Sequence, residues 1–126
     1  MDDYLKNWIT KADNDLKAAE HELDRAESEI LADIVCFHCQ QAVEKYLKAY
    51  LITRKAEFGK THNLEYLLEL CAKSNPAFIS LELGNLSFYA VEIRYPDEFY
   101  LPALEEAQKS FKLACKIKDF ILALIK

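Results

Sequence analysis

The sequence predicts a single all-α domain, an up-and-down antiparallel bundle of about five helices, three of them long and two short. The chain has 126 residues, enough for one continuous hydrophobic core but not for two. Hydrophobic residues make up 52% of it, so it can bury a core. It contains only two Gly and three Pro, whereas sandwiches and barrels need many sharp turns. We therefore expect one helical domain over residues 1–126.

Two long helices are expected in the first half of the chain. Over residues 4–26, apolar residues recur every three or four positions, which is the period of a helix with one buried face. Ser28 is the expected N-cap of a second helix over about residues 29–55. The second helix is apolar nearly all round. This pattern is typical of a central helix, or of one that also packs a second chain on its Phe37/Leu51 side, and both interpretations remain open.

Two shorter helices are expected in the middle of the chain. A loop around Gly59 precedes a helix from Asn63 to about Lys73, with Asn63 as its N-cap. Asn75 and Pro76 then suit the N-cap and the first turn of a fourth helix.

Residues 78–90 fit two different structures. Apolar residues alternate with polar ones before Gly84 and Asn85, which is typical of a hairpin. The same residues also fit one face of a helix, and an isolated two-stranded hairpin is only marginally stable in water. We therefore expect a helix that is disturbed near Gly84 and stopped by Pro96. The long final helix is expected to begin near Pro102.

The charge and the glycines of the chain exclude some functions. The formal net charge is -5, which is too acidic for broad, non-specific coating of DNA. Its two glycines stand far apart, so neither a P-loop nor a dinucleotide-binding loop can be formed. Residues 31–60, however, contain five basic residues and only three acidic ones. A local basic patch of this kind would suit one anionic ligand.

Nothing in the sequence indicates export or membrane insertion. Its start lacks the basic head and apolar stretch of a signal peptide, and no run approaches the ~18 apolar residues of a membrane span. We expect a cytoplasmic protein with four reduced, buried cysteines. Cys36, His38 and Cys39 resemble half a metal site, but zinc needs four ligands. We therefore interpret the cysteines as structural and His38 as a satisfied core histidine, and we expect neither a metal nor a cofactor.

Three separate stretches carry residues that suit an anion. Gln41, Lys45 and Lys48 are spaced by four and then three residues, which puts them on one helical face. Lys60 and His62 precede a helix start, where free N–H groups and the helix dipole favour an anion.

Arg94 opens the third stretch, in which Tyr95, Pro96 and Asp97 form a rigid turn that supports the guanidinium. Arginine suits a bidentate grip on phosphate. Taken singly, each stretch also fits a structural role, as solvated lysines, as a helix cap, or as an arginine paired with Asp97.

Together the three stretches resemble the HEPN domain family (higher eukaryote and prokaryote nucleotide-binding). The shared motifs are a QQA-x-E-x-x-x-KA helix at residues 40–49, a K-T-H-N-L helix start at residues 60–64 and an R-Y-P turn at residues 94–96. The motifs occur in the family's order, and the similarity runs from about Asp13 to Ile125.

The resemblance implies a helical bundle, commonly a homodimer, that associates with nucleotides or RNA. Prokaryotic members are often paired with a small nucleotidyltransferase in what look like toxin–antitoxin modules. Many members are metal-independent ribonucleases with an R-x4-6-H motif. Here the positions where that His should follow Arg94 hold Phe99, Tyr100 and Leu101. Tyrosine, with a reference pKa near 10, is a poor base at neutral pH.

Three functional hypotheses follow from these residues. The preferred one is a non-catalytic module of a nucleotidyltransferase-associated pair that binds the phosphate of a nucleotide or RNA. Its binding residues would be Arg94, His62, Lys60, Lys48, Lys45 and Gln41, and a homodimer or the partner would complete the site. The second is a metal-independent ribonuclease toxin that uses Arg94 with Tyr100 or His62. The third is a dimeric helical scaffold without a ligand.

Overall fold

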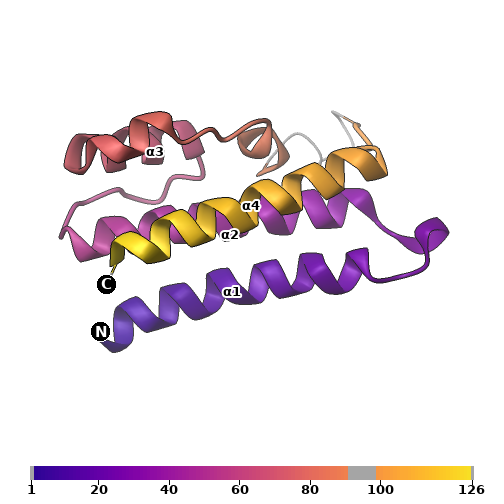
Figure 1. Ribbon diagram of the computed structural model, residues 1–126, viewed down its shortest axis with the longest axis horizontal. Coiled ribbons are helices and arrows are strands. Elements are labelled where there is room, and N and C mark those ends of the chain that lie inside the picture. The colour runs from indigo at the N-terminus through magenta and orange to yellow at the C-terminus, as the bar shows by residue number, and fades with distance from the viewer. Residues whose placement is uncertain (1, 91–98, 126) are drawn as a thin grey trace.

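Four α-helices form most of the computed structural model, which describes residues 2–90 and 99–125 (Figure 1). Their bounds are Asp3–Leu23 for α1, Ala32–Thr53 for α2, Leu64–Ser74 for α3 and Leu104–Ile125 for α4. Three short 3-10 turns, Glu27–Glu29, Pro76–Ser80 and Leu86–Ala90, lie in the connections. The described residues contain no strand, and the predicted all-α class is confirmed.

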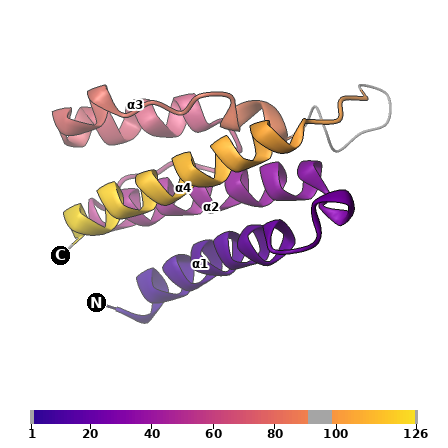
Figure 2. The ribbon, with the colours of Figure 1, turned by 45° about the vertical axis from the view of Figure 1, so that its right-hand side comes forward.

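α2 is the central helix of the fold. It contacts α1, α3, α4 and the 3-10 turn Leu86–Ala90. Figure 2 shows it between α1 on one side and the layer that contains α3 on the other. Val35, Tyr46 and Leu51 of α2 are fully buried. The prediction of a central helix is therefore confirmed, and Leu51, on the side expected for a second chain, is buried within this chain.

The starts of α1 and α2 are each marked by a contact of a carboxylate with a backbone N–H group. Asp2 caps α1, because its side chain accepts a hydrogen bond from the backbone N–H of Leu5 at 2.8 Å. The predicted start of the second helix at Ser28 is wrong, since Ser28 lies in a 3-10 turn and α2 begins at Ala32. Leu31 precedes α2 with extended backbone, and its N–H donates to the carboxylate of Glu22 at 3.0 Å. This contact joins the connection between the helices to the end of α1, and α2 begins only after it, at Ala32.

The two asparagine caps are confirmed. The Asn63 side chain accepts a hydrogen bond from the N–H of Tyr66 at 3.0 Å and starts α3. The Asn75 side chain accepts one from the N–H of Ala77, also at 3.0 Å, with Pro76 in the first turn. Each side chain satisfies an N–H group that the helix itself cannot pair.

The segment after Pro76 is neither the predicted helix nor a hairpin. Up to residue 90 it contains two five-residue 3-10 turns, so the expected fourth helix is wrong over residues 76–90. Gly84 separates them with a φ of +56°, in the left-handed region, and a Cβ there would lie 3.0 Å from Leu113 Cδ2 of α4. The turns nevertheless bury apolar side chains, namely Phe78, Leu83, Leu86 and Tyr89. Because a 3-10 turn brings residues i and i+3 to one face, the segment reaches the core without forming a longer helix.

One detail of the expected up-and-down order differs. α1 runs antiparallel to α2, but α4 runs in the same direction as α2 (Figures 1 and 2). After α3, residues 76–90 cross back along the bundle as short turns rather than as a helix. Within the described residues, no helix is both long and apolar enough to cross a lipid bilayer.

Candidate functional site

A continuous set of hydrogen-bonded polar side chains connects α1, α2 and the loop before α3. We call this set the polar network. Its members are Asp15 of α1, His38, Gln40, Gln41, Glu44, Lys45 and Lys48 of α2, and His62 of the loop. Two of the three stretches singled out in the sequence meet in it.

Glu44 is the centre of the polar network. It is only 4% exposed, yet its carboxylate has three partners. Lys48 Nζ donates to Oε2 at 3.0 Å, and His62 Nδ1 lies 2.9 Å from Oε1. Gln40 Nε2 lies 3.3 Å from the same Oε1 and 3.3 Å from the backbone carbonyl of His62. A buried carboxylate needs such partners, because burial removes its hydration.

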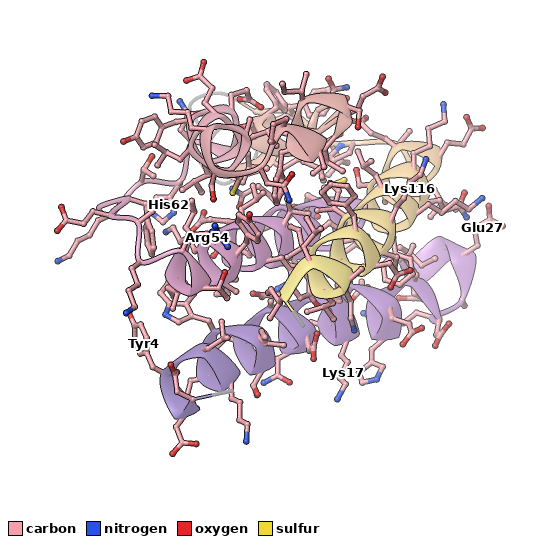
Figure 3. The ribbon with its side chains drawn as sticks, turned by 60° about the vertical axis from the view of Figure 1, so that its left-hand side comes forward. Tyr4, Lys17, Glu27, Arg54, His62 and Lys116 are labelled. Carbon is pink, nitrogen blue, oxygen red and sulfur yellow. The ribbon has the colours of Figure 1, made fainter. Side chains whose placement is uncertain are left out.

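His62 is held at the surface by this buried carboxylate. Its side chain is 63% exposed, while that of Glu44 is 5% exposed. Because Nδ1 faces Glu44, Nε2 is the ring nitrogen that remains for a ligand. Figure 3 shows His62 at the same end of the molecule as Tyr4 and Arg54, far from Glu27.

The start of α3 is less open to an anion than the sequence suggested. The N–H of Leu64 donates to the Ser87 hydroxyl at 3.3 Å, and that of Tyr66 donates to the Asn63 side chain. The N–H of Asn63 itself faces Thr61 Oγ1 at 3.1 Å. Most N–H groups of this turn are thus already satisfied, so an anion here would depend on side chains.

The other half of the polar network is organised by Asp15. Lys45 Nζ donates to Asp15 Oδ2 at 2.6 Å, and His38 Nδ1 lies 2.8 Å from Oδ1. Lys45 also lies 3.4 Å from Gln41 Oε1, and Gln41 Nε2 donates to Gln40 Oε1 at 2.7 Å, which joins the two halves. His38 thus has a hydrogen-bond partner as expected, but its predicted place in the core is wrong, because its side chain is 30% exposed.

The lysines of α2 differ in what they can reach. The Lys48 side chain is 7% exposed, is paired with Glu44, and lies 5.8 Å from the ring centroid of Trp8 and 5.6 Å from that of Phe58. An ammonium in this position holds Glu44 in place rather than contacting a ligand at the surface. The Lys45 side chain is 22% exposed.

The remaining predicted site residues are placed as follows. Lys60 is exposed on the same loop as His62, and its ammonium forms no ion pair with a described residue. Arg94 and its turn residues Tyr95, Pro96 and Asp97 lie outside the described residues.

Sequence reasoning missed Asp15, Trp8 and Phe58. Asp15 is the carboxylate that neutralises Lys45, and the two rings enclose the ammonium of Lys48. The available signal for Asp15 was its position beside the buried Leu16 on the first helix, since an acid next to a core face often meets a cation of the neighbouring helix.

Tyr100 is committed to a carboxylate. Its hydroxyl donates to Glu106 Oε1 at 2.5 Å, and the Tyr89 hydroxyl donates to the other oxygen of the same carboxylate. The hydrogen bond to Glu106 is the main cause that raises the pKa of Tyr100 above its ordinary value. A raised pKa leaves even less phenolate at neutral pH than free tyrosine has, so Tyr100 has less of the form that could accept a proton.

The cysteines have the character of buried thiols. Cys36, Cys39 and Cys71 are fully buried, whereas Cys115 is partly exposed, and all four are free. Burial raises the pKa of Cys36 to about 11 and that of Cys71 to about 12. Thiolate is the form that binds metals and attacks electrophiles, so these thiols are inert near neutral pH. Among the described residues, no three His, Cys, Asp or Glu side chains gather as metal ligands would.

Comparison with known proteins gives the following result. The family model of the HEPN domain matches residues 5–124. A crystal structure of an archaeal HEPN homologue is similar in fold, with a TM-score of 0.66 and 24% sequence identity, covering 97% of this chain and 98% of the other. No curated protein matches the chain.

Proposed function

This chain belongs to the HEPN domain family, and from that premise we propose that it is a non-catalytic module that binds the phosphate of a nucleotide or RNA. Its binding residues are the exposed His62 and Lys60 together with Arg94. Glu44 holds His62 in place, and the rest of the polar network, including Gln41, Lys45 and Lys48, supports Glu44.

The proposal is supported above all by the geometry of His62. This imidazole comes from one motif and is fixed by Glu44 of another, and 63% of the His62 side chain is still exposed. A ring that is fixed in this way loses little conformational entropy when it binds an anion. Lys60 two residues earlier adds a positive charge to the same loop. In this proposal Arg94 supplies a bidentate contact to phosphate oxygens, and Tyr95, Pro96 and Asp97 are the residues expected to support its guanidinium.

A binding role is favoured over cleavage because a catalytic base is missing at the family's usual position. Phe99, Tyr100 and Leu101 stand where the ribonuclease members carry histidine. The Tyr100 hydroxyl already donates to Glu106, so it cannot take a proton from an RNA 2′-hydroxyl near neutral pH.

The proposal includes the partners that the family resemblance implies. We place the chain in a cytoplasmic homodimer that pairs with a nucleotidyltransferase in a toxin–antitoxin-like module. Four free thiols suit a reducing compartment. Sedimentation of the purified chain tests the homodimer, and a monomer at micromolar concentration would remove it from the proposal.

Titration of the purified chain with ATP and with a short single-stranded RNA tests the phosphate site. We expect Arg94→Ala to weaken both about tenfold or more, because a hydrogen bond to a charged group contributes about 1.5–3 kcal/mol. Arg25→Ala is the matched control, since Arg25 is exposed and pairs with Glu22 and Glu29 elsewhere on the surface. Equal binding by the wild type and Arg94→Ala, or binding by neither, would refute the proposal.

A second candidate function is metal-independent cleavage of RNA. The contact between His62 and Glu44 favours it, because a carboxylate that orients an imidazole is the usual arrangement of a general base. The same titration samples decide between the two. Cleavage products that form without metal, and disappear in His62→Ala and Arg94→Ala, would establish the ribonuclease. Intact RNA in a saturated complex supports the binding module.

A further inference from the structure

A groove of about 510 Å³ lies beside the first turns of α1. It is lined by Tyr4, Asn7, Trp8 and Lys11 of α1 and by Lys45 of α2. The four α1 residues share one face, because positions 4, 7, 8 and 11 follow the period of an α-helix. A volume of this size falls within the range of about 300–1,000 Å³ that is usual for small-molecule sites.

The charges that line the groove are positive. None of its described lining residues is acidic, although the whole chain has a net charge of -5. Lys11 forms no ion pair with any described residue. Lys45 Nζ uses two of its three donors, on Asp15 Oδ2 and Gln41 Oε1, which fixes the ammonium and leaves one donor. Two ammonium groups from two helices therefore border the same space, and only one of them is neutralised.

The aromatic rings of the groove are pre-arranged. Trp8 is held by Phe58, with ring centroids 6.1 Å apart at 88°, and by Lys48 Nζ at 5.8 Å. The Tyr4 ring meets Trp8 edge-on at 6.4 Å and 86°, and Tyr4 remains 60% exposed. An exposed ring beside a fixed indole offers a platform on which a flat ligand can stack.

We propose that this groove binds a planar aromatic anion of the nucleoside monophosphate class. The base stacks on the exposed ring of Tyr4 with its edge toward Trp8, because the two rings are nearly perpendicular. The amide of Asn7 hydrogen-bonds to the edge of the base, and the phosphate lies between Lys11 and Lys45. The ligand class is shared with the proposed function and in that respect rests on it, but the binding residues of the groove do not include Arg94, Lys60 or His62.

Trp8 provides a direct readout, because it is the only tryptophan of the chain. The intact protein is titrated with AMP, and in separate arms with adenosine and with inorganic phosphate, while Trp8 fluorescence is followed. We expect a saturable change with AMP at lower concentration than with either half of the molecule. Tyr4→Ala and Lys11→Gln should each raise the half-saturating concentration about tenfold. Lys17→Gln is the matched control, since Lys17 is an exposed cation of the same helix away from Tyr4 (Figure 3).

The remaining outcomes would contradict nucleotide binding in this groove. Absence of a saturable change with AMP, or an equal response in Lys11→Gln and Lys17→Gln, would exclude it. A response to phosphate as strong as to AMP would show an anion site without a base platform. Arg94→Ala separates the two sites: the groove requires an unchanged Trp8 response in this variant. Suppose that Arg94→Ala loses RNA binding and that AMP does not change Trp8 fluorescence in the wild type. This result would leave the proposed function standing and refute the groove alone.

Discussion

Replacing Glu44 with Gln should lower the free energy of unfolding by about 3–5 kcal/mol, as is usual when one partner of a buried ion pair is removed. The carboxylate is 4% exposed, and Lys48 beside it is 5% exposed. In this variant the ammonium of Lys48 stays buried beside a neutral amide and the rings of Trp8 and Phe58, without the negative charge that balanced it. Urea unfolding followed by circular dichroism measures the change.

Two further variants make this expectation specific. Glu69→Gln removes an exposed carboxylate of α3 and should change stability by less than about 0.5 kcal/mol. Glu44→Gln combined with Lys48→Met should recover much of the loss, because the Met side chain keeps the packing and removes the unpaired charge. Additive losses in the double variant would show that Glu44 and Lys48 do not stabilise each other.

Replacing Phe78 with Ala should cost about 3–5 kcal/mol. Phe78 is fully buried, and its ring lies 4.6 Å from that of Tyr50 and 5.1 Å from that of Phe120. It therefore joins the 3-10 turn Pro76–Ser80 to both α2 and α4, and its removal leaves a cavity between three elements. Thermal or urea unfolding measures the loss.

The neighbouring residue provides the control for this variant. Ile79 is 76% exposed, so Ile79→Ala should change stability by less than about 0.5 kcal/mol. Equal effects of Phe78→Ala and Ile79→Ala would contradict the packing of this turn.

The parts of the fold that depend on local sequence could be predicted. The stripe of α1 and the caps at Asn63 and Asn75 follow from neighbours within four residues. The turns over residues 76–90 could not be predicted, because Gly84 packs on Leu113, which lies 29 positions later in the chain. The start of α2 was missed for a similar reason, since Glu22 of α1 holds the N–H of Leu31.

The sequence predicted part of the polar network, namely Gln41, Lys45, Lys48 and His62, but not the partners of these side chains. A helical wheel places Lys45 and Lys48 on one face but does not show what covers that face. In the fold, Asp15 pairs with Lys45, and Trp8 and Phe58 cover Lys48. These partners come from a different helix and from a loop, which a wheel of one helix does not show. The wheel therefore suggests a solvated surface where the structure has a network that is largely covered.

The imidazole resonances of the chain test the central claim most directly. It has only three histidines, His21, His38 and His62, so nitrogen NMR can follow each ring while ATP or a short RNA is added. We predict that the resonances of His62 move with saturation, that those of His38 and His21 stay, and that Arg94→Ala removes the movement. A saturated complex in which the His62 ring does not respond, or in which all three rings respond alike, would contradict a phosphate site at this loop.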